Sequence, residues 1–208
     1  MLKNFIVLEG LDGAGTTTQM KAVAEQIGCF TTAEPTKDNT GRLLRRCLAG
    51  EIDVPKSTMA YLFAADRHEH LYGSGGVVEK AGKGIVLCDR YLFSSFAYQG
   101  DERLQKLVSG LNSGFPLPQL TIWLDVPPEV CMERLSQRDG QKEIYENLDY
   151  LRGVHERYKA LFTGKTRLGV EKINVLHLDG TLPKDVLTHR IVKEIRALSR
   201  NRDIGLKR

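Results

Sequence analysis

Four short apolar segments constrain the fold more than any other feature of this sequence. They are FIVLE (5–9), GIVLC (84–88), LTIWLDV (120–126) and INVLHL (173–178), and CFTTAE (29–34) is a weaker fifth. None alternates strictly between apolar and polar residues, as a strand with one solvated face does. Such segments are typical of strands that are covered on both faces, as in parallel sheets.

Helical patterns separate these strands. The predicted helices cover residues 17–27, 41–49, 58–71, a segment opened by Pro127 and Pro128, and the periodic patterns of residues 148–161 and 187–198. Strands that alternate with helices predict a parallel sheet with right-handed crossovers, here as one α/β domain over residues 1–208. Ligands of such sheets bind beyond the carboxyl ends of the strands, which directs the search to residues 10–18, 34–36, 89–91 and the segment from Asp125.

Composition excludes several classes of protein. The net charge is only +4 and the Lys and Arg residues are scattered, which argues against nucleic acid as a partner. The four cysteines are widely spaced without a C-x-x-C pair, so we expect free thiols in a reducing cytoplasm and no zinc site. No apolar segment reaches about 18 residues, and the N-terminus does not resemble a signal peptide, so no membrane partner is expected.

The stretch GLDGAGTTT resembles the phosphate-binding pattern G-x-x-x-x-G-K-[ST], except that Thr16 stands at the lysine position. A strand before it and a helix after it give the context in which such a loop holds a nucleotide phosphate through inward N–H groups. The predicted ATP-binding residues are Gly10, Leu11, Asp12, Gly13, Ala14, Gly15, Thr16, Thr17 and Thr18. Thr16 carries no charge, whereas a cation about 4 Å from a phosphate oxygen contributes roughly 4 kcal/mol to binding. From this stretch alone, a glycine turn that binds no ligand is therefore as compatible with the sequence as a phosphate loop.

Two residues are candidate Mg²⁺ ligands. Thr17 stands where the hydroxyl of such a phosphate loop binds the metal, and Asp89 follows the strand at residues 84–88, where a Walker B carboxylate would lie. The acid alone is a weak signal, since acids often end strands. Its position beside a phosphate loop makes the interpretation as a metal ligand stronger.

A longer segment carries a family resemblance. CDRYLFSSFAYQG (88–100) closely resembles the D-R-Y-x-x-S-S-x-A-Y-Q-G signature of bacterial thymidylate kinases, and LFAADRHEH (62–70) resembles their L-F-A-A-x-R helix. The FIVLEGLDGAG, AEPT and LTIWLDVPPEVCMERL segments also match in order and spacing. The resemblance implies a nucleoside monophosphate kinase fold with a phosphate loop, a five-stranded parallel sheet flanked by helices, and a short lid. It further implies a homodimer that uses ATP and Mg²⁺ to phosphorylate dTMP to dTDP in dTTP synthesis.

The resemblance also implies an acceptor site. Its members are Glu34, Arg45, Phe63, Arg67, Arg90, Ser94, Ser95, Tyr98, Gln99 and Tyr145. Phe63 would stack on thymine and Arg67 would bond to the base, and their i, i+4 spacing places both on one helical face. Arg90 and Arg45 would bind the acceptor phosphate, for which the guanidinium fork is suited. Core packing for Phe63 and a solvated helix face for Arg45 stay open as alternatives.

The same family pattern implies roles around the sugar. Ser95 and Gln99 resemble residues at the base edge, and Tyr98 resembles a ring that crowds the 2′ position and favours deoxyribose. Asp12 matches an acid near the acceptor 3′-hydroxyl, although a turn-forming Asp before Gly13 is the alternative. Capping or packing is the alternative for Ser95, Tyr98 and Gln99, and Glu34 receives no specific role.

The charged segment 136–147 is the predicted lid, because long charged loops beside a phosphate site often close over the nucleotide. The chain resembles the branch of the family that carries its catalytic cations there, so Arg138 and Lys142 are predicted as catalytic together with Arg90 and Asp12, and Arg134 is a weaker candidate. Thr16 and Ala33 stand where the family usually has a lysine and an arginine. We therefore expect a lid cation to supply the missing charge.

Three alternatives to a dTMP kinase stay open at this point. Thr16 could mark a catalytically impaired or non-catalytic nucleotide-binding relative. The acceptor could instead be thymidine or another nucleoside monophosphate. Weak nucleic-acid binding through the basic C-terminal segment RALSRNRDIGLKR is the third.

Overall fold

The computed structural model describes residues 1–100, 102–137, 147–163 and 173–205, with side chains up to residue 198. It contains a sheet of five parallel strands in the order β2-β3-β1-β4-β5. The strands are β1 (Leu2–Gly10), β2 (Phe30–Ala33), β3 (Val86–Asp89), β4 (Pro118–Asp125) and β5 (Val175–Asp179). All five predicted strands are therefore confirmed, as is the parallel sheet.

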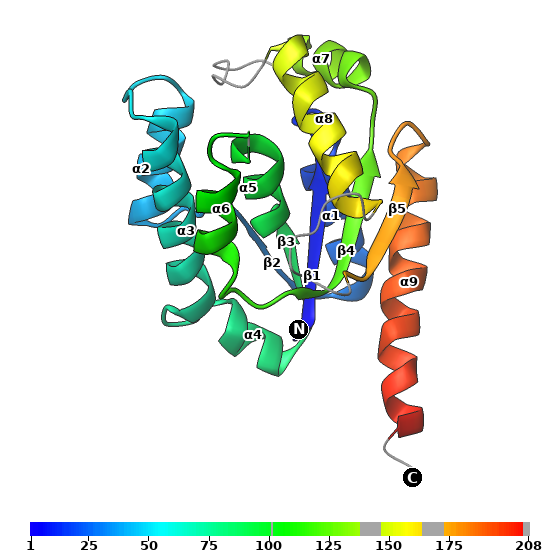
Figure 1. The fold of residues 1–208 in the computed structure, drawn as a ribbon. Helices are drawn as coiled ribbons and strands as arrows, with labels where there is room; N and C mark the ends of the chain where they lie inside the picture. The colour runs from blue at the N-terminus through cyan, green and yellow to red at the C-terminus, as the bar shows by residue number, and fades with distance from the viewer. Residues whose placement is uncertain (101, 138–146, 164–172, 206–208) are drawn as a thin grey trace.

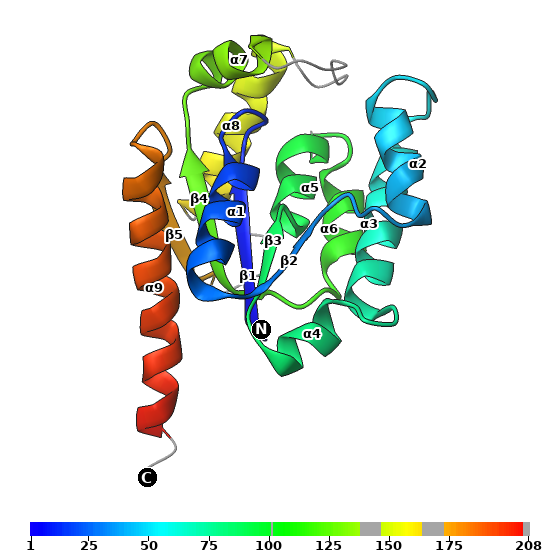
Figure 2. The same ribbon diagram turned by 180° about the vertical axis from the view of Figure 1, so that it is seen from behind.

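Helices connect the strands and cover both faces of the sheet (Figures 1 and 2). They are α1 (Thr16–Ile27), α2 (Asn39–Leu48), α3 (Lys56–Tyr72), α4 (Val77–Lys83), α5 (Leu92–Gln99), α6 (Gln105–Asn112), α7 (Pro128–Ser136), α8 (Leu148–Phe162) and α9 (Lys184–Gly205). In both views α1 and α9 lie on one side of the sheet, and α5 and α8 on the other. Among the described residues, no helix combines the length and the apolar character needed to cross a membrane.

The six predicted helices are present, and Ser94 and Ser95 lie in a further helix, α5. Neither α4 nor α6 was predicted. They have seven and eight residues, which is too short for a distinct apolar period to emerge.

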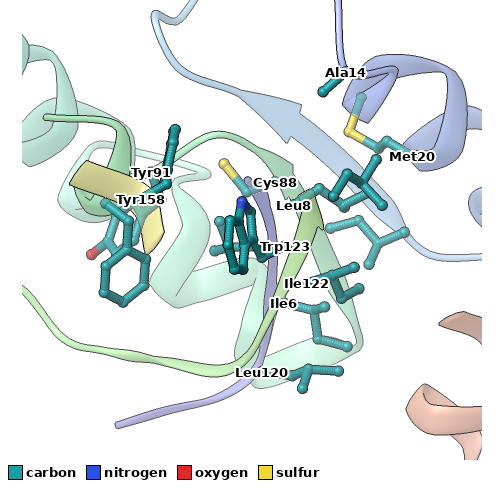
Figure 3. Close-up of a cluster of buried hydrophobic side chains, with 14 of the residues drawn as sticks. Ile6, Leu8, Ala14, Met20, Cys88, Tyr91, Leu120, Ile122, Trp123 and Tyr158 are labelled. Carbon is teal, nitrogen blue, oxygen red and sulfur yellow. The ribbon is translucent and has the colours of Figure 1, made fainter. Parts of the chain in front are cut away.

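The central strands are buried on both faces. Every residue of β1 from Phe5 to Gly10 is buried, and so is every residue of β3. Figure 3 shows the side chains of Ile6, Leu120 and Ile122 on one side of strands β1 and β4, and that of Trp123 on the other. A strand without polar alternation folds this way because both of its faces need an apolar partner.

The carboxyl ends of the strands meet at one edge of the sheet, the upper edge in Figure 1. Leu8 of β1 is aligned with Asp89 of β3, and Gly10 with Leu124 of β4. The loop after β1 and the acid that ends β3 are therefore neighbours, although they are far apart in the sequence.

Candidate active site

The glycine-rich stretch forms the turn between β1 and α1. Gly13 has φ +85°, and a Cβ atom there would lie 2.6 Å from the carbonyl oxygen of Cys131, so only glycine fits. Gly15 has φ +94° and precedes the helix, which has no capping side chain and no acid in its first turn. The first N–H groups of α1 and the positive end of its dipole therefore suit an anion.

Thr17 and Asp89 lie against each other at this turn. The Thr17 hydroxyl donates a hydrogen bond to Oδ2 of Asp89, while Oδ1 of Asp89 is buried and has no partner among the described residues. A hydroxyl oxygen beside a carboxylate oxygen without a partner fits a hard divalent cation such as Mg²⁺. Among the described residues, no group of three or more His, Cys, Asp or Glu side chains is placed to hold a metal ion.

Arg67 of α3 is buried in a polar network. Its Nε atom donates to Oε2 of Glu34 at 2.9 Å, and its Nη2 atom donates to Ser95 Oγ at 3.2 Å. A further bond runs from Nη1 to Oδ1 of Asn112. The other carboxylate oxygen of Glu34 lies 3.0 Å from Nδ1 of His70. Glu34 thus balances the buried guanidinium, as a charge without solvent requires.

Arg90 directly follows β3 and reaches across to the loop. Its Nη2 atom lies 2.6 Å from Oδ1 of Asp12, and its Nη1 atom donates to Ser94 Oγ at 3.2 Å. The Tyr98 hydroxyl donates to Oδ2 of Asp12 at 2.9 Å. Burial raises the pKa of Tyr98 well above its ordinary value, so the phenol keeps the proton that it donates.

One cavity of about 1130 Å³ joins these clusters. It extends from the phosphate turn along the carboxyl ends of β1, β2 and β3 toward α2 and α3. The predicted site residues that line it are Asp12, Thr17, Glu34, Arg45, Phe63, Arg67, Asp89, Arg90, Ser94, Ser95, Tyr98 and Gln99. Residues predicted from separate motifs are therefore brought to one space that is large enough for nucleotides.

Comparison with known families agrees with this geometry. The family model described as thymidylate kinase matches residues 8–177. The chain belongs to the thymidylate kinase family. The resemblance noted in the D-R-Y and L-F-A-A-x-R segments is thereby confirmed.

Relatives within the thymidylate kinase family match over most of the chain. A putative thymidylate kinase of Treponema pallidum is 38% identical over 205 residues, which are 96% of this chain and 98% of that protein. A thymidylate kinase of Leptospira borgpetersenii is 36% identical over 170 residues, covering 78% and 82% of the two chains. The fold also resembles that of a thymidylate kinase from Candida albicans, with a TM-score of 0.74 at 22% identity over 94% of this chain and 92% of the other.

The structure places the side chains of Arg45 and Arg46 in different surroundings. The guanidinium of Arg45 donates to the carbonyl oxygens of Pro35 and Thr36, the latter at 3.4 Å, and lines the cavity. Arg46 instead forms an exposed ion pair with Glu51 at 3.0 Å. Only Arg45 is therefore placed to meet a ligand in the cavity.

Arg134 of α7 contacts the back of the phosphate turn. Its Nη1 atom donates to the carbonyl oxygens of Gly13 and Ala14, each at 3.4 Å, and its Nη2 atom donates to that of Gly180 at 3.4 Å. Carbonyl groups drawn toward Arg134 leave the N–H groups of the turn on the opposite side, which helps to hold the loop in an anion-binding form. The predicted Arg138, Lys142 and Tyr145 lie outside the described residues.

Sequence reasoning missed four residues that shape the site. Asn112 and His70 complete the Arg67–Glu34 network, and Tyr158 and Glu9 lie behind Arg90. Glu9 did leave a signal, because an acid inside an otherwise apolar strand must find partners if the strand is buried. The others are joined to the site by contacts that the linear pattern does not reveal.

Proposed function

We propose that this chain transfers the γ-phosphoryl group of ATP to the phosphate of dTMP, giving dTDP and ADP. The observation that carries the proposal is that Thr17 and Asp89, the proposed donor-side residues, line one cavity together with Phe63 and Arg90, the proposed acceptor-side residues. Phosphoryl transfer requires positioning and charge stabilisation rather than covalent chemistry from the protein. Membership of the thymidylate kinase family supports dTMP as the acceptor.

On the donor side, the N–H groups of residues 10–18 would bind the ATP phosphates. The N-terminus of α1 adds its partial positive charge, while Thr16 adds a hydrogen-bond donor without charge. Thr17 and Asp89 would hold Mg²⁺ with the nucleotide. The bound ion would neutralise charge on the β- and γ-phosphates.

On the acceptor side, Phe63 and Arg67 lie on one face of α3 and both line the cavity, which suits a flat base. Ser95 and Gln99 would meet the base edge. Gln99 is buried, and its Oε1 atom has no hydrogen-bond partner among the described residues, so a ligand N–H such as N3–H of thymine can satisfy it.

The acceptor phosphate would lie between Arg45 and Arg90. Arg90 is partly exposed and pairs with Asp12, so an incoming phosphate can replace that carboxylate as its partner. Asp12 would then be available to the 3′-hydroxyl, while Tyr98 crowds the 2′ position.

Several further parts of the proposal follow from the family pattern. Residues 136–147 would form the lid of a single kinase domain, and Arg138 or Lys142 would bring the cation that Thr16 does not provide. Tyr145 would reach the acceptor. We also propose a homodimer and a cytoplasmic location, the latter supported by four cysteines that are all free.

The direct test is steady-state release of ADP from ATP·Mg²⁺ with dTMP, dUMP, CMP or thymidine as acceptor. We expect dTMP to be preferred, with a turnover on the order of 1 s⁻¹ or more. Nucleotide binding without turnover on any acceptor would refute the proposal and identify a non-catalytic relative.

Arg45 and Arg46 provide a matched pair of variants for the acceptor site. Arg45→Ala should raise KM for dTMP about tenfold or more, since it removes a charge-assisted phosphate contact. Arg46→Ala removes a neighbouring exposed charge and should leave KM within about twofold. Equal effects of the two variants would contradict the proposed phosphate position.

A further inference from the structure

Glu9 is a fully buried carboxylate at the end of β1, immediately before the phosphate turn. Its Oε1 atom accepts a hydrogen bond from the backbone N–H of Tyr91 at 3.0 Å. Its Oε2 atom accepts from Ser94 Oγ at 2.7 Å and from Tyr158 Oη at 2.8 Å. Glu9 therefore joins β1, the segment after β3, α5 and α8.

The backbone of Arg90 lies in the left-handed region, with φ 70°. Residues other than glycine rarely adopt this conformation unless the surroundings enforce it, and such residues cluster at functional sites. Two adjacent N–H groups hold it here: that of Arg90 donates to Leu8 O at 2.9 Å, and that of Tyr91 donates to Glu9. The carboxylate of Glu9 thus fixes the turn that directs Arg90 into the cavity.

Glu9 also reaches the guanidinium of Arg90 through Ser94. A serine hydroxyl has one hydrogen, which Ser94 donates to Glu9 while its oxygen accepts from Nη1 of Arg90. The carboxylate therefore sets the direction of this hydrogen-bond chain. A neutral group at the same place can donate to Ser94 instead, and then competes with Arg90 for the serine oxygen.

We propose that Glu9 is a positioning residue of the acceptor site, which holds Arg90 in its left-handed conformation and orients Ser94 so that the guanidinium meets the acceptor phosphate. Glu9 acts through Arg90 and has no role in holding the base or the donor phosphates. The inference rests on the proposed function, in which Arg90 binds the phosphate of dTMP.

Glu9 ionises within the pH range in which an activity assay can be run. Burial raises its pKa to about 7, although the bonds from Ser94, Tyr158 and Tyr91 and the charge of Arg90 act in the opposite direction. The titratable and charged groups that face it from the elements around it are Cys88, Arg90, Tyr91 and Tyr158. Asp12, Asp89 and Tyr98 lie around Arg90. The aligned arrangement needs the carboxylate and is therefore favoured above pH 7.

The test compares wild type with Glu9→Gln, which keeps the shape and removes the charge. We expect KM for dTMP to rise about tenfold or more, because a displaced arginine loses its phosphate contact, while KM for ATP stays within about twofold. The dTMP phosphate itself titrates near pH 6. Dividing the wild-type kcat/KM by that of Glu9→Gln at each pH between 6 and 9 cancels the titration of the dTMP phosphate. This ratio should rise as the pH increases through 7.

Tyr158→Phe is a second variant, which keeps Glu9 but removes one bond to its charged form. Because the lost bond lowers the pKa of Glu9, the kcat/KM profile of Tyr158→Phe should rise at a pH about one unit higher than that of wild type. If Glu9→Gln does not fold, this shift decides the proposal, and an unchanged midpoint overturns it.

The outcomes separate the two proposals. Turnover of dTMP by wild type together with an unchanged dTMP KM and a flat profile ratio for Glu9→Gln would overturn the role of Glu9 alone. An equal loss toward ATP and dTMP would also overturn it, because that result indicates general damage. No wild-type turnover of dTMP would overturn the proposed function, and the inference with it.

Discussion

Replacement of Glu9 by glutamine should stabilise the folded chain at neutral and alkaline pH while it weakens the acceptor site. Glu9 is fully buried, and burial raises its pKa from an ordinary value of 4.5 to about 7. The folded protein therefore binds this proton more tightly than the unfolded chain does. The stabilisation that results is complete below pH 4.5 and is lost as the pH rises to 7.

The size of this effect follows from the two pKa values. An interval from 4.5 to about 7 corresponds to about 3 kcal/mol at 1.36 kcal/mol per pH unit. Most of it, about 2–3 kcal/mol, falls between pH 5 and pH 8. Glutamine at position 9 has no charge to bury, so its folding free energy does not carry this contribution.

Urea unfolding of both proteins at pH 5 and pH 8 measures the effect. The unfolding free energy of Glu9→Gln minus that of wild type should increase by about 2–3 kcal/mol from pH 5 to pH 8. Every other titrating group is common to both proteins and largely cancels in this comparison. A shift below about 0.5 kcal/mol would refute the reasoning, because Glu9 would then titrate almost equally in both states.

Three further predictions concern the donor, the base and the lid. Asp89→Asn should lower kcat by about 100-fold and raise the Mg²⁺ concentration needed for half-maximal rate, since it removes the carboxylate beside Thr17; an unchanged Mg²⁺ titration would contradict the metal assignment. Phe63→Ala should raise KM for dTMP about 10- to 100-fold with little change for ATP, as expected for loss of a stacked base; an equal change for both substrates would point to a packing role. Arg138→Ala or Lys142→Ala should reduce kcat by on the order of 10³-fold if that residue stabilises the transferring phosphoryl group, and near-normal kcat in both would exclude compensation by the lid.

The sheet could be predicted because its strands carry a strong local signal. A strand such as β1, which is buried from Phe5 to Gly10, must be apolar on both faces, and this appears directly in the sequence. The short helices α4 and α6 carry no comparable signal. Their positions are set by contacts with β1 and with α3 and α5 rather than by their own periodicity.

The site was predictable only in part, for a related reason. Asp89, Arg90 and Ser95 lie within one short motif, and Phe63 and Arg67 within another, so spacing alone could group them. The partners of these residues come from distant segments. Asn112 is 45 positions from Arg67, and Tyr158 is 149 positions from Glu9, and no short pattern records such pairs.

The surroundings of Arg67 and Arg90 suit them to different tasks in the proposed acceptor site. Arg67 is 1% exposed and is bound to Glu34, so removing its carboxylate partner would leave a buried charge unpaired. It is therefore suited to forming a fixed wall beside a base. Arg90 lies at 2.6 Å from Asp12 with both side chains partly exposed, so exchange of the carboxylate for a phosphate costs less.

Arg90 must keep its direction when Asp12 no longer holds it. The hydroxyl of Ser94, which is bound to Glu9, accepts from Nη1 of Arg90, whereas Asp12 is bound to Nη2, so the contact with Ser94 does not depend on Asp12. In the proposed acceptor site, a buried anion that is unfavourable for stability would thus have a physical reason to be present, since it supports an arginine whose partner changes when the phosphate binds. If Glu9 has this role, the same anion also gives the acceptor site a pH dependence around the Glu9 pKa of about 7.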